Sequence, residues 1–162
     1  MNLQALLPLR FFRWCEATGI GSMIHNSKWA FAVIETLHIM ALAVLLGSFL
    51  IVDLRLFGVG MKKQTVGEVA HQFGATSWVS FIIMVASGIP MYLTEAVKLS
   101  TSSPFFYKMV FLCLALLFHL TVHRRATRAD QDGGTALAKL AASLSLACWL
   151  AVALAGRAIA YL

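Results

Sequence analysis

The stretch Trp29–Val52, WAFAVIETLHIMALAVLLGSFLIV, decides the fold class of this chain, because it is a long apolar segment. Glu35 and His38 are its only ionisable side chains. An α-helix rises about 1.5 Å per residue, so about 20 apolar residues cross the roughly 30 Å hydrocarbon core of a bilayer. Three further stretches have comparable length and apolar character: Phe73–Leu93, Pro104–Val122 and Thr135–Gly156. The sequence therefore predicts four transmembrane helices.

The composition of the whole chain agrees with a membrane protein. Of its 162 residues, 60% are hydrophobic and 12% are charged, and the mean hydropathy is +0.81. Soluble globular domains carry about 25% charged residues. The apolar stretches are also too long for the roughly ten-residue alternating strands of an outer-membrane barrel. We therefore expect an all-α, integral membrane four-helix bundle that forms a single membrane domain over 1–162, with helices at about 29–55, 72–96, 104–124 and 135–157.

The first 28 residues predict an amphipathic segment that lies at the membrane surface and is retained in the mature protein. They lack the apolar core and small-residue cleavage site of a signal peptide. Apolar residues recur with arginines between them: Leu3, Leu6, Leu7, Phe11 and Trp14, with Arg10 and Arg13. This pattern favours an interfacial helix, which Pro8 and Gly19-Ile20-Gly21 interrupt.

The net charge of +6 and the pI near 9.6 are interpreted here through membrane topology rather than nucleic-acid binding. Basic residues follow the first and third predicted helices: Arg55, Lys62, Lys63, Arg124, Arg125 and Arg128. The positive-inside rule predicts that these two connections face the cytoplasm. Both termini then face the periplasm of a bacterial inner membrane.

Four ionisable residues are predicted at similar depth near the periplasmic side. They are Glu35 and His38 in the first helix, Lys108 in the third and Arg157 in the fourth. A charged residue inside a span costs about 2.5 to 3.5 kcal/mol, so such residues are functional candidates. In one interpretation, His38 ligates a haem iron, Lys108 or Arg157 neutralises the propionates, and Glu35 is a charge partner.

Two other interpretations of this outer group stay open. Glu35 and His38 share a helix face and could form half of a carboxylate metal site, although such sites need a second Glu-x-x-His motif that this chain lacks. Alternatively, the four residues form a network of ion pairs and hydrogen bonds that only holds the helices together.

A second group of polar residues is predicted at the cytoplasmic ends of the helices. His71 precedes the second apolar stretch, while His119 and His123 lie one turn apart at the end of the third. These histidines could bind a metal or a second haem, or face lipid headgroups. From the helical rise, His38 and His119 differ in depth by about 10 Å, so one flat cofactor would not bind both.

Small residues in the first two helices are interpreted as close-packing sites between helices. They are Gly47, Ser48, Gly74, Ser77, Ser87 and Gly88.

Several short motifs follow one another along the chain: Ile34–His38, Leu46-Gly47, Val52–Leu56, Ser87-Gly88, Phe106–Lys108, His123 and Gly156–Tyr161. From about Trp29 onward, the chain resembles a widespread family of small four-helix bacterial inner-membrane proteins. More distantly, it is similar to the copper-resistance protein D family and to the J-type membrane protoporphyrinogen oxidase, which is implicated as a haem b protein. The resemblance implies that His38 matches a helix-1 haem ligand and that Lys108 matches a helix-3 lysine.

Together these observations predict a b-type haem protein of the bacterial inner membrane that transfers electrons, as a small cytochrome or as the membrane subunit of a redox complex. His38 is the expected iron ligand, and a second haem at His71, His119 and His123 would give a transmembrane electron path. The expected partners are the lipid bilayer, redox subunits or further copies of the chain. The alternatives are porphyrinogen oxidation in the same pocket, transport of copper or a small solute, and a structural subunit without cofactor.

Overall fold

The computed structural model describes residues 7–129 and 132–161, and within these ranges every regular element is a helix. Four helical spans are long and apolar enough to cross a membrane. They are Ala30–Leu56 (α3), Val66–Thr94 (α4), Ser103–His123 (α6, Ser103–Phe118, continued by the π-helix η2, His119–His123) and Ala136–Ala158 (α8). The prediction of an all-α, four-helix membrane bundle is confirmed, and the protein is a multi-pass membrane protein.

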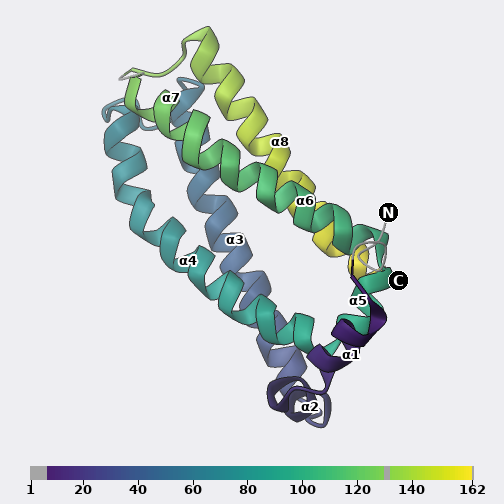
Figure 1. Cartoon of the computed structure of the whole chain (residues 1–162). Helices are drawn as coiled ribbons and strands as arrows, with labels where there is room; N and C mark the ends of the chain where they lie inside the picture. The colour runs from purple at the N-terminus through teal and green to yellow at the C-terminus, as the bar shows by residue number, and fades with distance from the viewer. Residues whose placement is uncertain (1–6, 130–131, 162) are drawn as a thin grey trace.

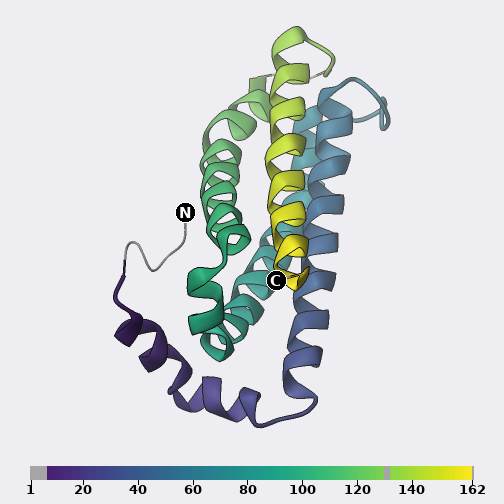
Figure 2. The same ribbon diagram turned by 90° about the vertical axis from the view of Figure 1, so that its right-hand side faces the viewer.

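The four spans pack in the order α4, α3, α8, α6 (Figures 1 and 2). α3 packs along α4 and also contacts α8, and α8 packs along α6. Leu45, Phe49, Met84, Trp149 and Val152 belong to the core cluster between these helices. Contacts between α4 and α6 are few in the described chain, and the short helix α7 (Arg124–Ala129) contacts α4 at one end. The bundle is therefore less tightly closed between α4 and α6 than elsewhere.

The second span begins earlier than the sequence predicts, at Val66 rather than near 72. A capping box explains the difference: Thr65 Oγ1 accepts a hydrogen bond from Glu68 N at 3.1 Å, and Glu68 Oε2 accepts one from Thr65 N at 2.7 Å. These side chains satisfy backbone N–H groups that have no partner within the helix. The helix thus extends beyond its apolar part, which is the only part that hydropathy detects.

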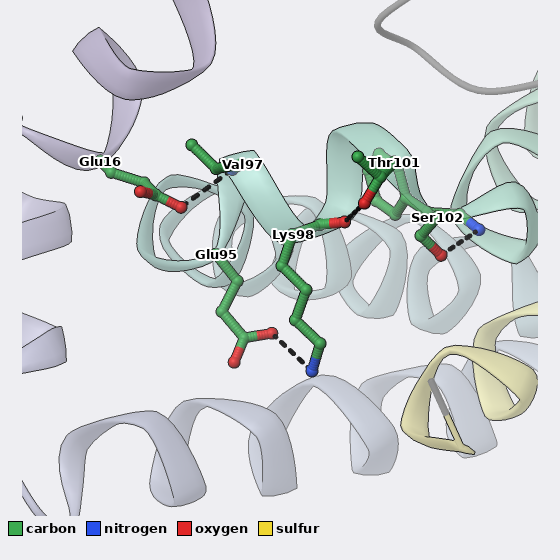
Figure 3. A network of polar contacts seen from close by, with 7 residues as sticks. Glu16, Glu95, Val97, Lys98, Thr101 and Ser102 are labelled. Atoms are coloured by element: carbon green, nitrogen blue, oxygen red, sulfur yellow. Dashed lines mark hydrogen bonds and ion pairs between the residues drawn. The ribbon is translucent and has the colours of Figure 1, made fainter. Parts of the chain in front are cut away.

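Two connections expected as loops are partly helical. The α4–α6 connection contains α5 (Ala96–Thr101), and the connection after the third span contains α7. Figure 3 shows polar contacts at the two ends of α5. At its start, Lys98 pairs with Glu95 at 3.8 Å. After its end, Ser102 Oγ accepts a hydrogen bond from Phe105 N at 3.3 Å and caps the next helix, α6. Hydropathy detects neither short element, and Glu95 at the start of α5 forms no side-chain capping hydrogen bond.

The N-terminal segment forms two short helices, α1 (Leu9–Glu16) and α2 (Gly19–His25), that lie across one end of the bundle (Figure 2). Phe12 and Cys15 are buried against Ala96, while the arginines and Trp14 of α1 are exposed. Glu16 Oε1 accepts a hydrogen bond from Val97 N in the first turn of α5 at 2.8 Å (Figure 3). The segment is helical, as two helices rather than one, and its location at the membrane interface stays a prediction; Leu3 and Leu6 lie outside the described residues.

Arg55 joins the two connections at the opposite end of the bundle. Its guanidinium is buried, with Nε donating to the carbonyl of Gln64 at 2.7 Å and Nη1 donating to the carbonyl of Asp132. Gly134 N also donates to Leu56 O at 2.8 Å. One side chain at the end of α3 thus holds both the α3–α4 loop and the loop before α8.

We expect Gly133→Ala to destabilise the protein by about 3 kcal/mol, because two costs add. Gly133 has φ +72°, where an L side chain costs about 1 to 2 kcal/mol, and its Cβ would overlap the Arg55 carbonyl. The measurement is thermal unfolding of the detergent-solubilised protein by circular dichroism. Gly60→Ala is the matched control, since Gly60 also has φ +72° but has open space around the added Cβ. Equal losses for the two variants would contradict the proposed steric overlap.

Candidate functional site

A cavity of about 530 Å³ lies between α4 and the η2–α7 segment, with α3 and α8 behind it. Four small residues of α4 line one wall: Gly67, Ala70, Gly74 and Ala75. They recur at i, i+3, i+7 and i+8, so they share one face of the helix. The absence of large side chains at these four positions leaves room for the cavity.

Aromatic side chains cover much of the rest of the cavity. Phe49 and Trp149 lie at the back with ring centroids 4.8 Å apart, and Trp78 and Phe81 line it from α4. A mostly aromatic and apolar lining with a few polar groups is typical of sites for organic ligands and cofactors.

Three histidine side chains line the cavity and supply imidazole nitrogens to it. His71 lines it from α4, whereas His119 and His123 line it from η2. The ring of His119 lies between Phe49, at a centroid distance of 4.3 Å, and His123, at 4.8 Å. His119 Nδ1 is buried and has no hydrogen-bond partner in the described chain. Buried polar atoms are usually paired, so this unpartnered nitrogen marks His119 as a candidate ligand-binding side chain.

His123 is fixed by a buried carboxylate. Its Nε2 lies 2.8 Å from Asp53 Oδ1 on α3, and the two side chains are 3% and 0% exposed. Ser145 of α8 faces the same carboxylate without reaching hydrogen-bond geometry, and Asp53 Oδ2 has no partner among the described residues. The Asp53–His123 pair links α3 to η2 and orients the imidazole beside His119.

Two arginines of α7, Arg124 and Arg128, complete the lining. Both are exposed, and neither forms an ion pair with an acidic residue in the described ranges. Guanidinium groups bind carboxylates through paired hydrogen bonds. The cavity therefore combines imidazole nitrogens, an aromatic lining and cations suited to carboxylate groups.

None of the outer residues, Glu35, His38, Lys108 and Arg157, lines this cavity. His38 Nδ1 lies 3.0 Å from Ser87 Oγ, and that hydroxyl donates to the carbonyl of Ile83 at 2.7 Å. Ser87 has a single hydroxyl hydrogen, so we assign His38 Nδ1 as the donor to Ser87. His38 Nε2 then keeps its lone pair, as an iron ligand requires, and the role of His38 in haem binding stays a prediction.

The other outer residues are only partly brought together. Lys108 is close enough to His38 to interact electrostatically, and its Cε lies 3.5 Å from where a Cβ on Gly156 would be. Arg157 instead contacts Tyr161, with Nη2 donating to the hydroxyl at 3.3 Å. Glu35 is half-buried and has no ion pair within the described residues. The described residues thus form no four-residue network of ion pairs and hydrogen bonds.

The small residues of the spans have two different roles. Gly88 is a close-packing site, because an added Cβ would lie 3.2 Å from His38 Cε1. For Gly47 and Gly74 the close-packing interpretation is wrong: nothing lies within 4 Å of a Cβ added at either position. Gly74 lines the cavity instead.

Among the residues that line the cavity, the sequence predicted only the three histidines as ligand-binding; Gly74 and Ser77 were interpreted as packing sites, and Arg124 and Arg128 through membrane topology. The one usable signal was the series of small residues on the His71 face of α4, at Gly67, Ala70, Gly74 and Ala75. The contributions of Phe49 and Trp149 depend on how α3 and α8 pack and leave no local pattern.

No group of three or more His, Cys, Asp and Glu side chains in the described residues is arranged to hold a metal ion. A porphyrin supplies four ligands to its own iron, so a haem needs only one or two imidazoles from the protein. The histidines of the cavity are sufficient in number for that purpose.

The comparisons with known proteins identify a family but no activity. A family model described as "Family of unknown function (DUF6644)" matches residues 11–162. No curated protein and no solved structure matches the chain. The matched range contains the residues that line the cavity as well as His38 and Lys108.

Proposed function

Because the chain belongs to the DUF6644 family, whose function is unknown, we propose its function from its own residues: it binds b-type haem in the cavity between α4 and η2–α7 and transfers electrons. The observation that carries the proposal is that His119, whose buried Nδ1 has no hydrogen-bond partner among the described residues, lines an aromatic cavity of about 530 Å³. Ionisable residues within a membrane span are costly, which makes His119 a functional candidate.

The residues of the cavity fit the parts of a haem. Its volume lies within the roughly 300 to 1,000 Å³ of ligand sites, and its aromatic and small side chains suit a flat apolar ring. His119 and His71 supply imidazoles from two different walls. Arg124 and Arg128 suit the two propionates, which carry negative charge at the aqueous edge of such a site.

The side chains around the ligand would hold it in one geometry. The Phe49 and His123 rings fix the plane of His119, and Asp53 fixes His123 from behind. Groups behind a ligating imidazole set its orientation and basicity. A bound haem iron would supply one-electron transfer, and the protein would supply ligation, burial and charge compensation.

Two further residues, His38 and Lys108, and the predicted membrane topology extend this proposal. A second haem at His38, with Lys108 as a cation beside it, would give two redox centres at different depths and a path across the membrane. We place the protein in a bacterial inner membrane with both termini periplasmic, so the cavity opens on the cytoplasmic side. The electron donor or acceptor would be another subunit or a further copy of the chain.

Filling the cavity tests the proposal. We expect Gly74→Leu to lower bound haem at least about tenfold, because the new side chain occupies the space along α4. The measurement is a pyridine haemochrome count per chain on protein expressed with added haem precursor. Gly47→Leu is the matched control, since Gly47 is also a helical glycine with open space but lies away from the cavity.

Each outcome of this test discriminates between functions. A b-type spectrum in the wild type and in Gly47→Leu, but not in Gly74→Leu, supports haem in the cavity. Equal loss in both variants, or a colourless wild-type protein, contradicts the proposal. The colourless result would favour transport of copper or a small solute, or a structural subunit.

A further inference from the structure

A second, smaller hollow of about 220 Å³ lies on the surface of η2 and α7. It is lined by Leu120, Thr121, Arg124, Arg125 and Arg128. These positions are spaced at i, i+1, i+4, i+5 and i+8, so they follow one face of the helix. Three guanidinium groups therefore gather directly after the end of the third span.

The positive charge of this hollow is not balanced within the described protein. The segment 119–128 contains no Asp or Glu, and the ion pairs of the described residues involve none of the three arginines. Arginine presents a planar fork of N–H donors that matches phosphate oxygens. Arginines that line a hollow and form no ion pair among the described residues therefore favour an anionic group carrying phosphate oxygens.

The surface next to the arginines identifies where that group comes from. Toward the membrane centre the same side of the third span exposes Leu114, Leu117 and Leu120, which are 50%, 62% and 43% exposed. Exposed leucines within a span contact acyl chains, and the arginines follow at the level of the headgroups. An apolar surface that ends at a phosphate-binding hollow matches a phospholipid better than a free anion.

We propose that this hollow binds the headgroup of an anionic phospholipid, with an acyl chain along Leu114, Leu117 and Leu120. This proposal does not depend on haem binding, although the two cavities share two arginines. Arg124 and Arg128 line both cavities, whereas Arg125 lines only this one. Arg125 thus distinguishes lipid binding from haem binding.

The test is native mass spectrometry of the delipidated protein titrated in detergent with phosphatidylglycerol or phosphatidylcholine. We expect tighter binding of phosphatidylglycerol. Arg125→Gln should weaken that binding about fivefold, and the triple variant Arg124→Gln/Arg125→Gln/Arg128→Gln about a hundredfold, following the contribution of one cation near a membrane surface. Lys62→Gln/Lys63→Gln is the control, since it removes charge from the loop after α3 but not from the hollow.

Three results would overturn the proposal. Equal binding of the two lipids would show that the arginines do not select charge. An equal loss in the Lys62/Lys63 control would show a general effect of net charge. Competition by inorganic phosphate at the concentration of the lipid would assign a free-anion site instead. The haem count of Arg125→Gln is measured in parallel and is expected to stay unchanged, which separates this site from the cavity.

Discussion

His119→Ala is expected to abolish the reduced-minus-oxidised b-type spectrum of the purified protein, with at least a tenfold fall in haem per chain. The reason is that His119 lines the cavity and its buried Nδ1 has no hydrogen-bond partner among the described residues. The measurement is the pyridine haemochrome count together with the visible difference spectrum. His25→Ala is the control, because His25 is exposed on α2 and does not line the cavity.

Two further histidine variants locate the haem. His71→Ala should keep haem but open one coordination position, which is detected as carbon monoxide binding to the reduced protein. His38→Ala should leave haem in the inner cavity intact and remove only a second, outer haem. If His38→Ala removes all haem while His119→Ala removes none, the outer site is the haem site and the cavity has another role.

His123→Leu is expected to give the largest loss of stability, about 3 to 5 kcal/mol. It removes the hydrogen-bond partner of Asp53, a carboxyl group that is 0% exposed, and leaves that group buried without this contact. Asp53→Leu should cost less, about 1 to 3 kcal/mol, because it leaves an imidazole that can stay neutral. Thermal unfolding in detergent, followed by circular dichroism, compares the two variants.

The double variant Asp53→Leu/His123→Leu tests the pairing directly. Replacing both partners by apolar residues removes the buried charge as well as its partner, so it should recover most of the loss caused by His123→Leu. If the two single losses simply add, the 2.8 Å contact between Nε2 and Oδ1 does not stabilise the fold. Haem content measured on the same samples shows whether the pair also supports His119.

The four spans could be predicted from the sequence with ends displaced by a few residues. Crossing the hydrocarbon core requires a helix of about 20 consecutive apolar residues, whose backbone groups all pair within the helix. Each span can therefore be recognised from its own stretch of sequence. The start of α4 was displaced because Thr65 and Glu68 extend the helix into a polar segment. α5 and α7 were not predicted because short helices depend on caps and on docking rather than on hydropathy.

The histidines of the candidate site could be identified from the sequence, but not their relative importance. An ionisable residue in a span stands out by its cost, so His38, His71, His119 and His123 were all candidates. The sequence favoured His38, whereas the cavity is lined by the other three. A cavity depends on which helix faces fail to meet, and no single helix encodes that.

The sequence by itself therefore determined the fold class, the number of spans and the list of polar residues inside them, because a bilayer selects each segment by its own composition. Only the tertiary structure decided that α4 and α6 make few contacts with each other. It also decided that Arg55 holds two loops and that Asp53 pairs with His123. These features depend on contacts between residues distant in sequence. Their geometry is set by how four similar apolar helices pack, which hydropathy does not distinguish.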